Sequence, residues 1–223
     1  MSHNPYLEYV NQCSAVFGNG KSLPLGDFPP PPAPVLIEDA PKVAILAPHP
    51  DDECVMGGLP LRLMREAGCK VINFPITYGS NPLRKKERAD ELAITCKWIG
   101  FDLVDLCPNG LEKIYPKTRS ENRSEWEKAV EILAKALSQH RPDILFFPNA
   151  NDWNQTHLGV NLLTMDALTA VNPHRITLVE TEFWGQTKAP NLLVENSIQE
   201  VADLVGALSH HRGEVLRNPF HLR

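Results

Sequence analysis

From residue 43 onward, apolar runs alternate with amphipathic stretches. The run from Val43 to Ala47 predicts a buried strand, and it is followed by a turn and a helical pattern that ends near Gly68. The same order then repeats, with strands predicted over 71–77, 101–106, 143–148, 175–183 and 192–195 and helices over 83–98, 125–140, 158–171 and 198–208. Alternating strands and helices predict a doubly wound α/β fold with a mostly parallel, Rossmann-like sheet.

Residues 1–42 depart from this regular pattern. The segment from Phe28 to Pro34 is rich in proline, which has no amide donor, so an extended polyproline II conformation is predicted there. We therefore divide the chain into an N-terminal arm, 1–42, and one α/β domain, 43–223. The pattern leaves open whether the arm is a flexible leader or packs on the body or on a neighbouring subunit.

Composition narrows the class of protein. The chain has 223 residues, of which 43% are hydrophobic and 22% charged, as in a water-soluble globular protein. Its apolar runs are far shorter than the roughly 20 residues of a membrane span, so none is expected. The net charge is −5 and the longest basic run is Arg84-Lys85-Lys86, which argues against nucleic acid or anionic lipid as a partner. A small neutral or polar substrate fits better.

The cellular location is read from the N-terminus and the cysteines. MSHNPYLEYVNQ shows no basic segment followed by an apolar one, so no secretory signal is expected and the predicted location is the cytoplasm. The five cysteines are scattered and form no CxxC motif. Reduced, mostly buried thiols agree with a reducing compartment.

Two polar clusters follow predicted strands, where parallel α/β sheets bind their ligands. The first is Pro48-His49-Pro50-Asp51-Asp52-Glu53, and the second runs from Asn149 to His157. One short loop holds an imidazole and three carboxylates, and the carboxylates repel one another unless a cation is bound. Imidazole and carboxylate together are a donor set that suits zinc. Alternatively, Asp51 or Asp52 caps the next helix, which accounts for one carboxylate but not for the string. No GxGxxG follows the first strand and no GxSxG is present, which disfavours dinucleotide binding and serine hydrolysis.

The string from Ala47 to Glu53, followed by Gly57-Gly58, resembles the signature of the PIG-L/LmbE-type zinc-dependent de-N-acetylases. These enzymes remove acetyl groups from N-acetylglucosaminyl compounds, and the resemblance spans residues 43 to about 215. It implies that His49 and Asp52 bind zinc and that Asp51 is the general base. The string from Asp152 to His157 stands in place of the family's D-x-H-P-D-H, which implies His157 as the third ligand.

The chain departs from the family pattern at two positions. Asn154 and Thr156 stand where the family has a histidine and an aspartate. Asn154 is expected to donate a neutral hydrogen bond to the oxyanion, without positive charge.

A weaker resemblance concerns Arg88. It begins a segment similar to the family's R-x-x-E-x-x-A…G, which implies that Arg88 lies near the substrate. The alternative is an exposed ion pair between Arg88 and Glu91 on the helix surface. Glu53 is expected to bond within its loop. His210 and His211 are expected at the surface or behind the ligands, not as ligands.

The resemblance implies a hydrolase that removes an acetyl group from an N-acetylated amino sugar or glycoconjugate. Zinc-bound water is the expected nucleophile, and Asp51 takes its proton and returns it to the departing amine. One alternative is an amidase of the same family that acts on another N-acyl small molecule. Another is a zinc-retaining sugar-binding or regulatory domain without turnover. The resemblance also implies a homo-oligomer, a trimer or a hexamer.

Overall fold

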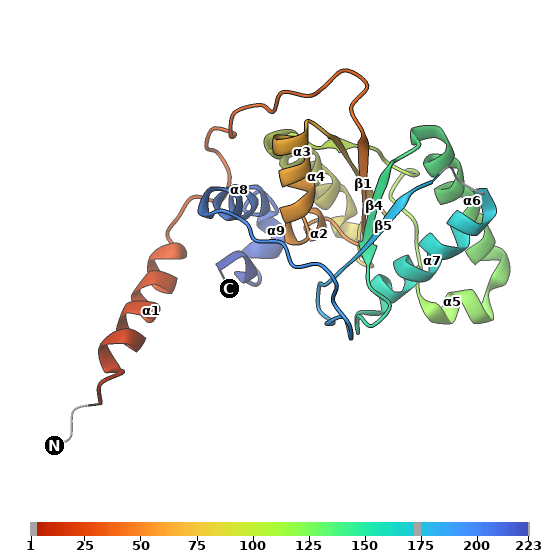
Figure 1. Ribbon diagram of the computed structural model, residues 1–223. Helices are drawn as coiled ribbons and strands as arrows, with labels where there is room; N and C mark the ends of the chain where they lie inside the picture. The colour runs from red at the N-terminus through yellow and green to blue at the C-terminus, as the bar shows by residue number, and fades with distance from the viewer. Residues whose placement is uncertain (1–3, 172–174, 223) are drawn as a thin grey trace.

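Five parallel strands form the central sheet of the computed structural model, which describes residues 4–171 and 175–222 (Figure 1). The strands are β1 (Lys42–Ala47), β2 (Lys70–Pro75), β3 (Asp102–Leu103), β4 (Ile144–Pro148) and β5 (Thr177–Thr181). They lie in the order β3-β2-β1-β4-β5, and every neighbouring pair is parallel. The predicted doubly wound α/β fold is confirmed, and the chain reverses its direction of winding between β1 and β4.

Helices cover both faces of the sheet (Figure 1). One face carries α2 (Asp52–Val55), α3 (Gly58–Ala67), α4 (Lys85–Ile99), α8 (Ile198–Leu208) and α9 (Arg212–Val215), and the other carries α5 (Pro116–Glu121), α6 (Arg123–His140) and α7 (Gln155–Val171). Two short 3-10 turns lie at Pro82–Arg84 and Phe220–Leu222. Along β1, Val43 and Ile45 face the first helix layer while Ala44 and Leu46 face the second. Burial on both sides explains why the strands are apolar throughout.

The ends of two helices follow from glycine. Gly68 and Gly100 end α3 and α4 with φ of 62° and 90°, the left-handed conformation that glycine adopts without steric cost. The predicted helix end near Gly68 is confirmed.

Two of the predicted strands differ from the structure. The strand predicted over 101–106 shortens to Asp102–Leu103, and the strand predicted over 192–195 is wrong. The latter segment crosses α3, where Arg62 Nη1 donates to the Glu195 carbonyl at 2.9 Å, and Leu193 is 97% exposed. It therefore lies over a helix and adds no strand to the sheet.

The N-terminal arm contains a helix that the sequence analysis did not predict. This helix, α1 (Leu7–Gly20), has no buried residue and projects from the body (Figure 1). Its apolar residues have helical spacing but no core to face. The proline-rich segment after it packs on the body: Trp98 Nε1 donates to the Phe28 carbonyl at 3.0 Å, and their rings meet edge to face.

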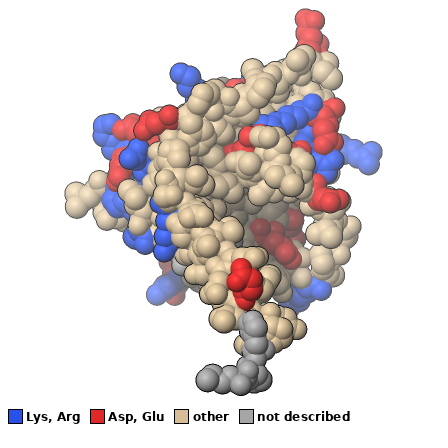
Figure 2. Space-filling view, turned by 90° about the vertical axis from the view of Figure 1, so that its left-hand side faces the viewer, with Lys and Arg blue, Asp and Glu red and all other residues tan. Residues whose placement is uncertain are grey.

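Two surface properties bear on possible partners. None of the helices within residues 4–171 and 175–222 has both the length and the apolarity to cross a membrane. Figure 2 shows acidic and basic side chains interspersed over one face of the molecule. That face has no continuous basic surface of the kind that binds nucleic acid.

Candidate active site

The loop after β1 and the first turn of α7, which follows β4, bring three candidate ligands together. His49 Nδ1 lies 3.3 Å from Asp52 Oδ2, and His157 Nε2 lies 3.4 Å from the same oxygen. Ligand atoms of these three residues all lie within 4.8 Å of one another. Because β1 and β4 are neighbours at the switch point of the sheet, loops about a hundred residues apart in the sequence meet at one edge.

The chemistry of this trio fits a metal ion. The His157 side chain is fully buried, and its Nε2 has no hydrogen-bond partner, which is costly for a buried polar atom. Burial raises the pKa of Asp52, but the neighbouring imidazoles of His157 and His49 outweigh burial and hold the pKa below its ordinary value. An ionised carboxylate and two imidazoles are a donor set that suits zinc.

A second carboxylate, Asp152, lies beside the other ring nitrogen of His157. Asp152 Oδ2 lies 3.3 Å from His157 Nδ1, and both side chains are fully buried. Burial lowers the pKa of His157, but Asp52 and Asp152 outweigh burial and raise it. A carboxylate on the far nitrogen of a ligating histidine fixes the ring and its tautomer. The sequence analysis gave Asp152 no role, although it opens the string that ends at His157.

Asp51, the expected base, has a strained backbone. Its φ is 112° and its ψ −30°, a conformation that is rare for any residue except glycine and that costs on the order of 1–3 kcal/mol. The Glu53 carboxylate holds it by accepting the Asp51 N–H at 2.9 Å. Burial and the neighbouring Asp52 raise the pKa of Asp51 well above its ordinary value, while Arg88 opposes them. A raised pKa suits a carboxyl group that both takes and returns a proton.

The helix-cap interpretation of these carboxylates does not hold. The Asp51 side chain makes no capping bond to α2. The carboxylate of Asp52 accepts the backbone N–H of His49, at 2.9 Å, on the other side of the loop. The Asp52 carboxylate therefore faces His49, another candidate ligand, and does not cap the helix.

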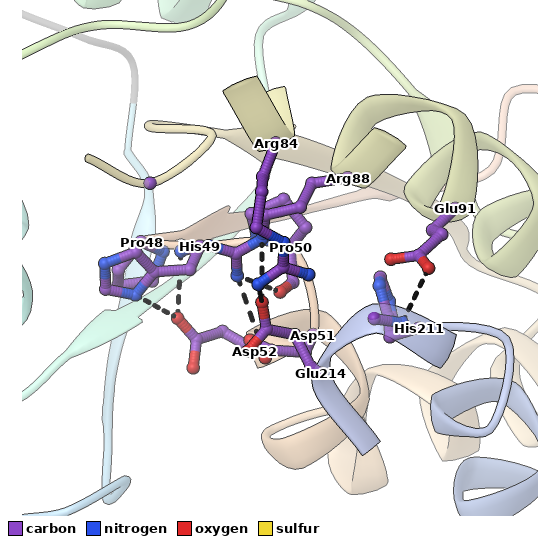
Figure 3. Close-up of polar contacts among 12 residues, drawn as sticks. Pro48, His49, Pro50, Asp51, Asp52, Arg84, Arg88, Glu91, His211 and Glu214 are labelled. Atoms are coloured by element: carbon purple, nitrogen blue, oxygen red, sulfur yellow. Dashed lines mark hydrogen bonds and ion pairs between the residues drawn. The ribbon is translucent and has the colours of Figure 1, made fainter. Parts of the chain in front are cut away.

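Arg88 lies beside the loop that carries Asp51 (Figure 3). Its Nη2 donates to the Pro50 carbonyl at 2.9 Å and lies 3.8 Å from Asp51 Oδ2. Its Nε lies 3.6 Å from the buried carboxylate of Glu214, which also accepts from Arg84 at 2.8 Å. The alternative of an exposed pair with Glu91 is wrong, because Glu91 accepts the N–H of Gly213 in the interior.

Asn154 begins α7. Its Oδ1 accepts the N–H of Thr156 at 2.9 Å, and its backbone carbonyl accepts the N–H of Leu158 at 3.0 Å. The side-chain oxygen thus satisfies an otherwise unpaired donor of the first helical turn. The amide NH₂ group of Asn154 is the part left to act on a substrate, and its donor role stays a prediction.

Comparison with known proteins places these residues in a family. The family model of GlcNAc-PI de-N-acetylase, PIG-L, matches residues 44–168, which is more than half of the chain and includes both loops. The chain belongs to the PIG-L family. No curated protein sequence matches it.

Solved structures resemble this PIG-L family member in fold. The N,N'-diacetylchitobiose deacetylase from Pyrococcus horikoshii has a TM-score of 0.60 and 17% identity, over 99% of this chain and 86% of its own. The conserved protein TT1542 from Thermus thermophilus has a TM-score of 0.57 and 23% identity, over 81% and 82%. The 4-carboxy-2-hydroxymuconate hydratase GalB from Pseudomonas putida has a TM-score of 0.54 and 14% identity, over 79% and 85%. These likenesses show a shared fold, which hosts more than one reaction.

In this PIG-L family member, Glu53 is held by a residue distant in sequence. His211 Nε2 lies 2.7 Å from Glu53 Oε1, and both side chains are fully buried. The expectation that Glu53 bonds within its loop holds, since its other oxygen accepts the Asp51 N–H. His211 lies behind the loop and not at the surface. A separation of 158 residues hid this contact from any local pattern.

We expect His211→Ala to destabilise the protein. The substitution leaves the buried Glu53 carboxylate without its partner, which costs about 1–3 kcal/mol, and more where a charge is involved. Urea denaturation followed by circular dichroism measures the free energy of unfolding. Lys86→Ala is the control, because its pair with Asp90 is exposed and such pairs contribute little. Equal free energies of unfolding for His211→Ala and the wild type would contradict the role given to this contact.

Proposed function

We propose that this PIG-L family protein hydrolyses the acetamide group of an N-acetylated amino sugar or glycoconjugate. The observation that carries the proposal is the convergence of His49, Asp52 and His157 beside the strained Asp51. Membership of a family described as GlcNAc-PI de-N-acetylases supports the reaction class, and the fold shared with a chitobiose deacetylase agrees with it.

His49, Asp52 and His157 are the residues we propose as zinc ligands. Zinc bound there supplies Lewis acidity that polarises the acetamide carbonyl. Asp51 takes a proton from the attacking water at its carboxylate and returns it to the amine nitrogen as the C–N bond breaks. The hydrogen bond from the Asp51 backbone N–H to the Glu53 carboxylate fixes the backbone of Asp51, and with it the Asp51 carboxylate. A fixed geometry for proton transfer lowers the entropic part of the barrier.

Two further residues are proposed to contact the substrate. Arg88 lies against the Pro50 carbonyl and Asp51, so its guanidinium is placed to bind a polar group of the substrate near the base. The NH₂ group of Asn154 is proposed to donate to the oxyanion of the tetrahedral intermediate. A neutral amide gives a weaker bond there than an imidazolium would.

The presence of Asn154 and Thr156 in place of the family's histidine and aspartate favours a second candidate function, a zinc-retaining domain that binds sugars without turnover. The two candidates differ in what they do to a bound N-acetylated sugar. An amidase acting on another N-acyl small molecule is a variant of the first candidate. Only the substrate separates it from the sugar deacetylase.

Acetate release tests the proposal. Zinc-loaded protein is incubated with N-acetylglucosamine, N,N'-diacetylchitobiose, GlcNAc-PI and non-sugar N-acyl compounds, and acetate is measured by a coupled enzymatic assay. We expect acetate from at least one N-acetylated sugar. Acetate from non-sugar compounds alone would support the other amidase. Sugar binding by calorimetry without acetate release, at one zinc per chain, would contradict the proposal and support the binding domain.

A further inference from the structure

Two exposed tryptophans lie together near the candidate active site. The Trp153 side chain is 68% exposed and that of Trp184 48%, and their ring centroids are 6.2 Å apart. The chain's other tryptophans are placed differently: Trp126 is buried, and Trp98 is half-buried against the arm. Leaving large indole rings in water forgoes hydrophobic stabilisation, so a neighbouring pair of them on the surface indicates a ligand.

The backbone at both tryptophans is connected to Asp152, the carboxylate that lies beside His157. Trp153 directly follows Asp152, and the N–H of Trp184 donates to Asp152 Oδ2 at 3.2 Å. The same oxygen lies 3.3 Å from His157 Nδ1. Next to Trp184, the ring of Phe183 meets that of His157 edge to face at 4.8 Å between centroids. The two tryptophans are therefore connected to His157 through Asp152 and Phe183, which both contact its ring.

The loop that carries Trp184 is held in one conformation. The side-chain amide of Asn149 donates to the carbonyls of Gly185 and Thr181, at 2.9 and 3.0 Å. Gly185 packs directly on the neighbouring backbone, since a Cβ there would lie 2.5 Å from the Asn151 carbonyl oxygen. An aromatic surface fixed in this way loses little conformational freedom when a ligand binds.

We propose that Trp153 and Trp184 form a stacking surface for a pyranose ring of the substrate, an inference that rests on the proposed function. The axial C–H bonds of a pyranose give it an apolar face that packs on an aromatic ring, while its hydroxyl groups stay in water. The indole N–H groups add donors for those hydroxyls. This surface recognises a sugar ring next to the scissile acetamide, so it favours a disaccharide or longer glycoconjugate over an N-acetylated monosaccharide.

The test compares Trp153→Ala and Trp184→Ala with the wild type on N-acetylglucosamine and N,N'-diacetylchitobiose. Each substitution removes one of the two aromatic faces, so we expect it to raise KM for the disaccharide about tenfold, with a smaller change in kcat. Monosaccharide KM should change less. Tyr9→Ala is the matched control, because Tyr9 is 66% exposed on the projecting α1.

Binding is measured separately from turnover in the Asp51→Asn background, by isothermal titration calorimetry with N,N'-diacetylchitobiose. A raised Kd in the tryptophan variants supports the inference. If the protein with Asp51 unchanged releases no acetate, only the proposed function fails. An unchanged Kd and KM in folded variants, checked by thermal melting, would overturn the inference. Loss of a dimer in analytical ultracentrifugation, with an unchanged Kd, would also overturn it and assign the pair to a subunit contact.

Discussion

His157→Ala is expected to be purified without stoichiometric zinc and to release no measurable acetate. His157 is one of only three protein groups in the candidate ligand set, and it is the fully buried one. Removing a residue that merely orients a ligand lowers metal affinity about 10- to 100-fold, so removing the ligand itself should have a larger effect. Elemental analysis gives the zinc content, and the acetate assay gives the activity.

The matched control for this experiment is His140→Ala. His140 ends α6 and packs edge to face on Phe74, away from the three candidate ligands. We expect the control to keep its zinc and its activity. Full zinc occupancy and wild-type turnover in His157→Ala would show that the metal, if one is required, is bound elsewhere.

Asp51→Asn is expected to retain zinc and to lower kcat about 10²-fold or more, because the proton acceptor is lost and no ligand is. Asparagine has the same shape and tolerates positive φ better than most residues, so the strained loop should be kept.

The raised pKa of Asp51 also predicts a pH effect. The base is active when deprotonated, so in the wild type kcat/KM should fall as pH drops through a pKa above the ordinary carboxyl range, and this limb should be absent in the variant.

Asp90→Asn is the control, since Asp90 is an exposed carboxylate on α4. Wild-type kcat in Asp51→Asn would mean that another group accepts the proton. Glu53 is poorly placed for that task, because one of its oxygens accepts from Asp51 N–H and the other contacts His211. Such a result would therefore move the search for the base outside the loop after β1.

The fold alone does not decide between reactions. A deacetylase and a hydratase both resemble this chain in structure. The decision rests on which side chains surround the three candidate ligands. Asp51, a carboxyl with a raised pKa, lies next to Asp52 in the chain, and Asn154 is proposed as a neutral donor. The two substitutions above test the candidate ligand set and the role of Asp51.

Local patterns in the sequence were sufficient for the alternating strands and helices of the sheet and for the two loops that carry the candidate ligands. Runs such as Val43 to Ala47 are apolar because both faces of the sheet are covered, and glycines at 68 and 100 end helices through their own backbone freedom. The string from His49 to Glu53 concentrates carboxylates, which is why the sequence predicts a cation there. These are properties of neighbouring residues, so they can be read without knowing the fold.

Contacts between distant segments were decided only by the tertiary structure. The pairing of β1 with β4 brings His157 to Asp52, and the packing of the C-terminal segment brings His211 to Glu53. The segment 192–195 has the apolar pattern of a strand, yet it crosses α3, and α1 forms without any core to face. The strain at Asp51 likewise depends on Glu53 and its partner. Such features depend on which segments pack against one another in the folded protein. The periodic pattern of a segment does not say which other segment it will contact.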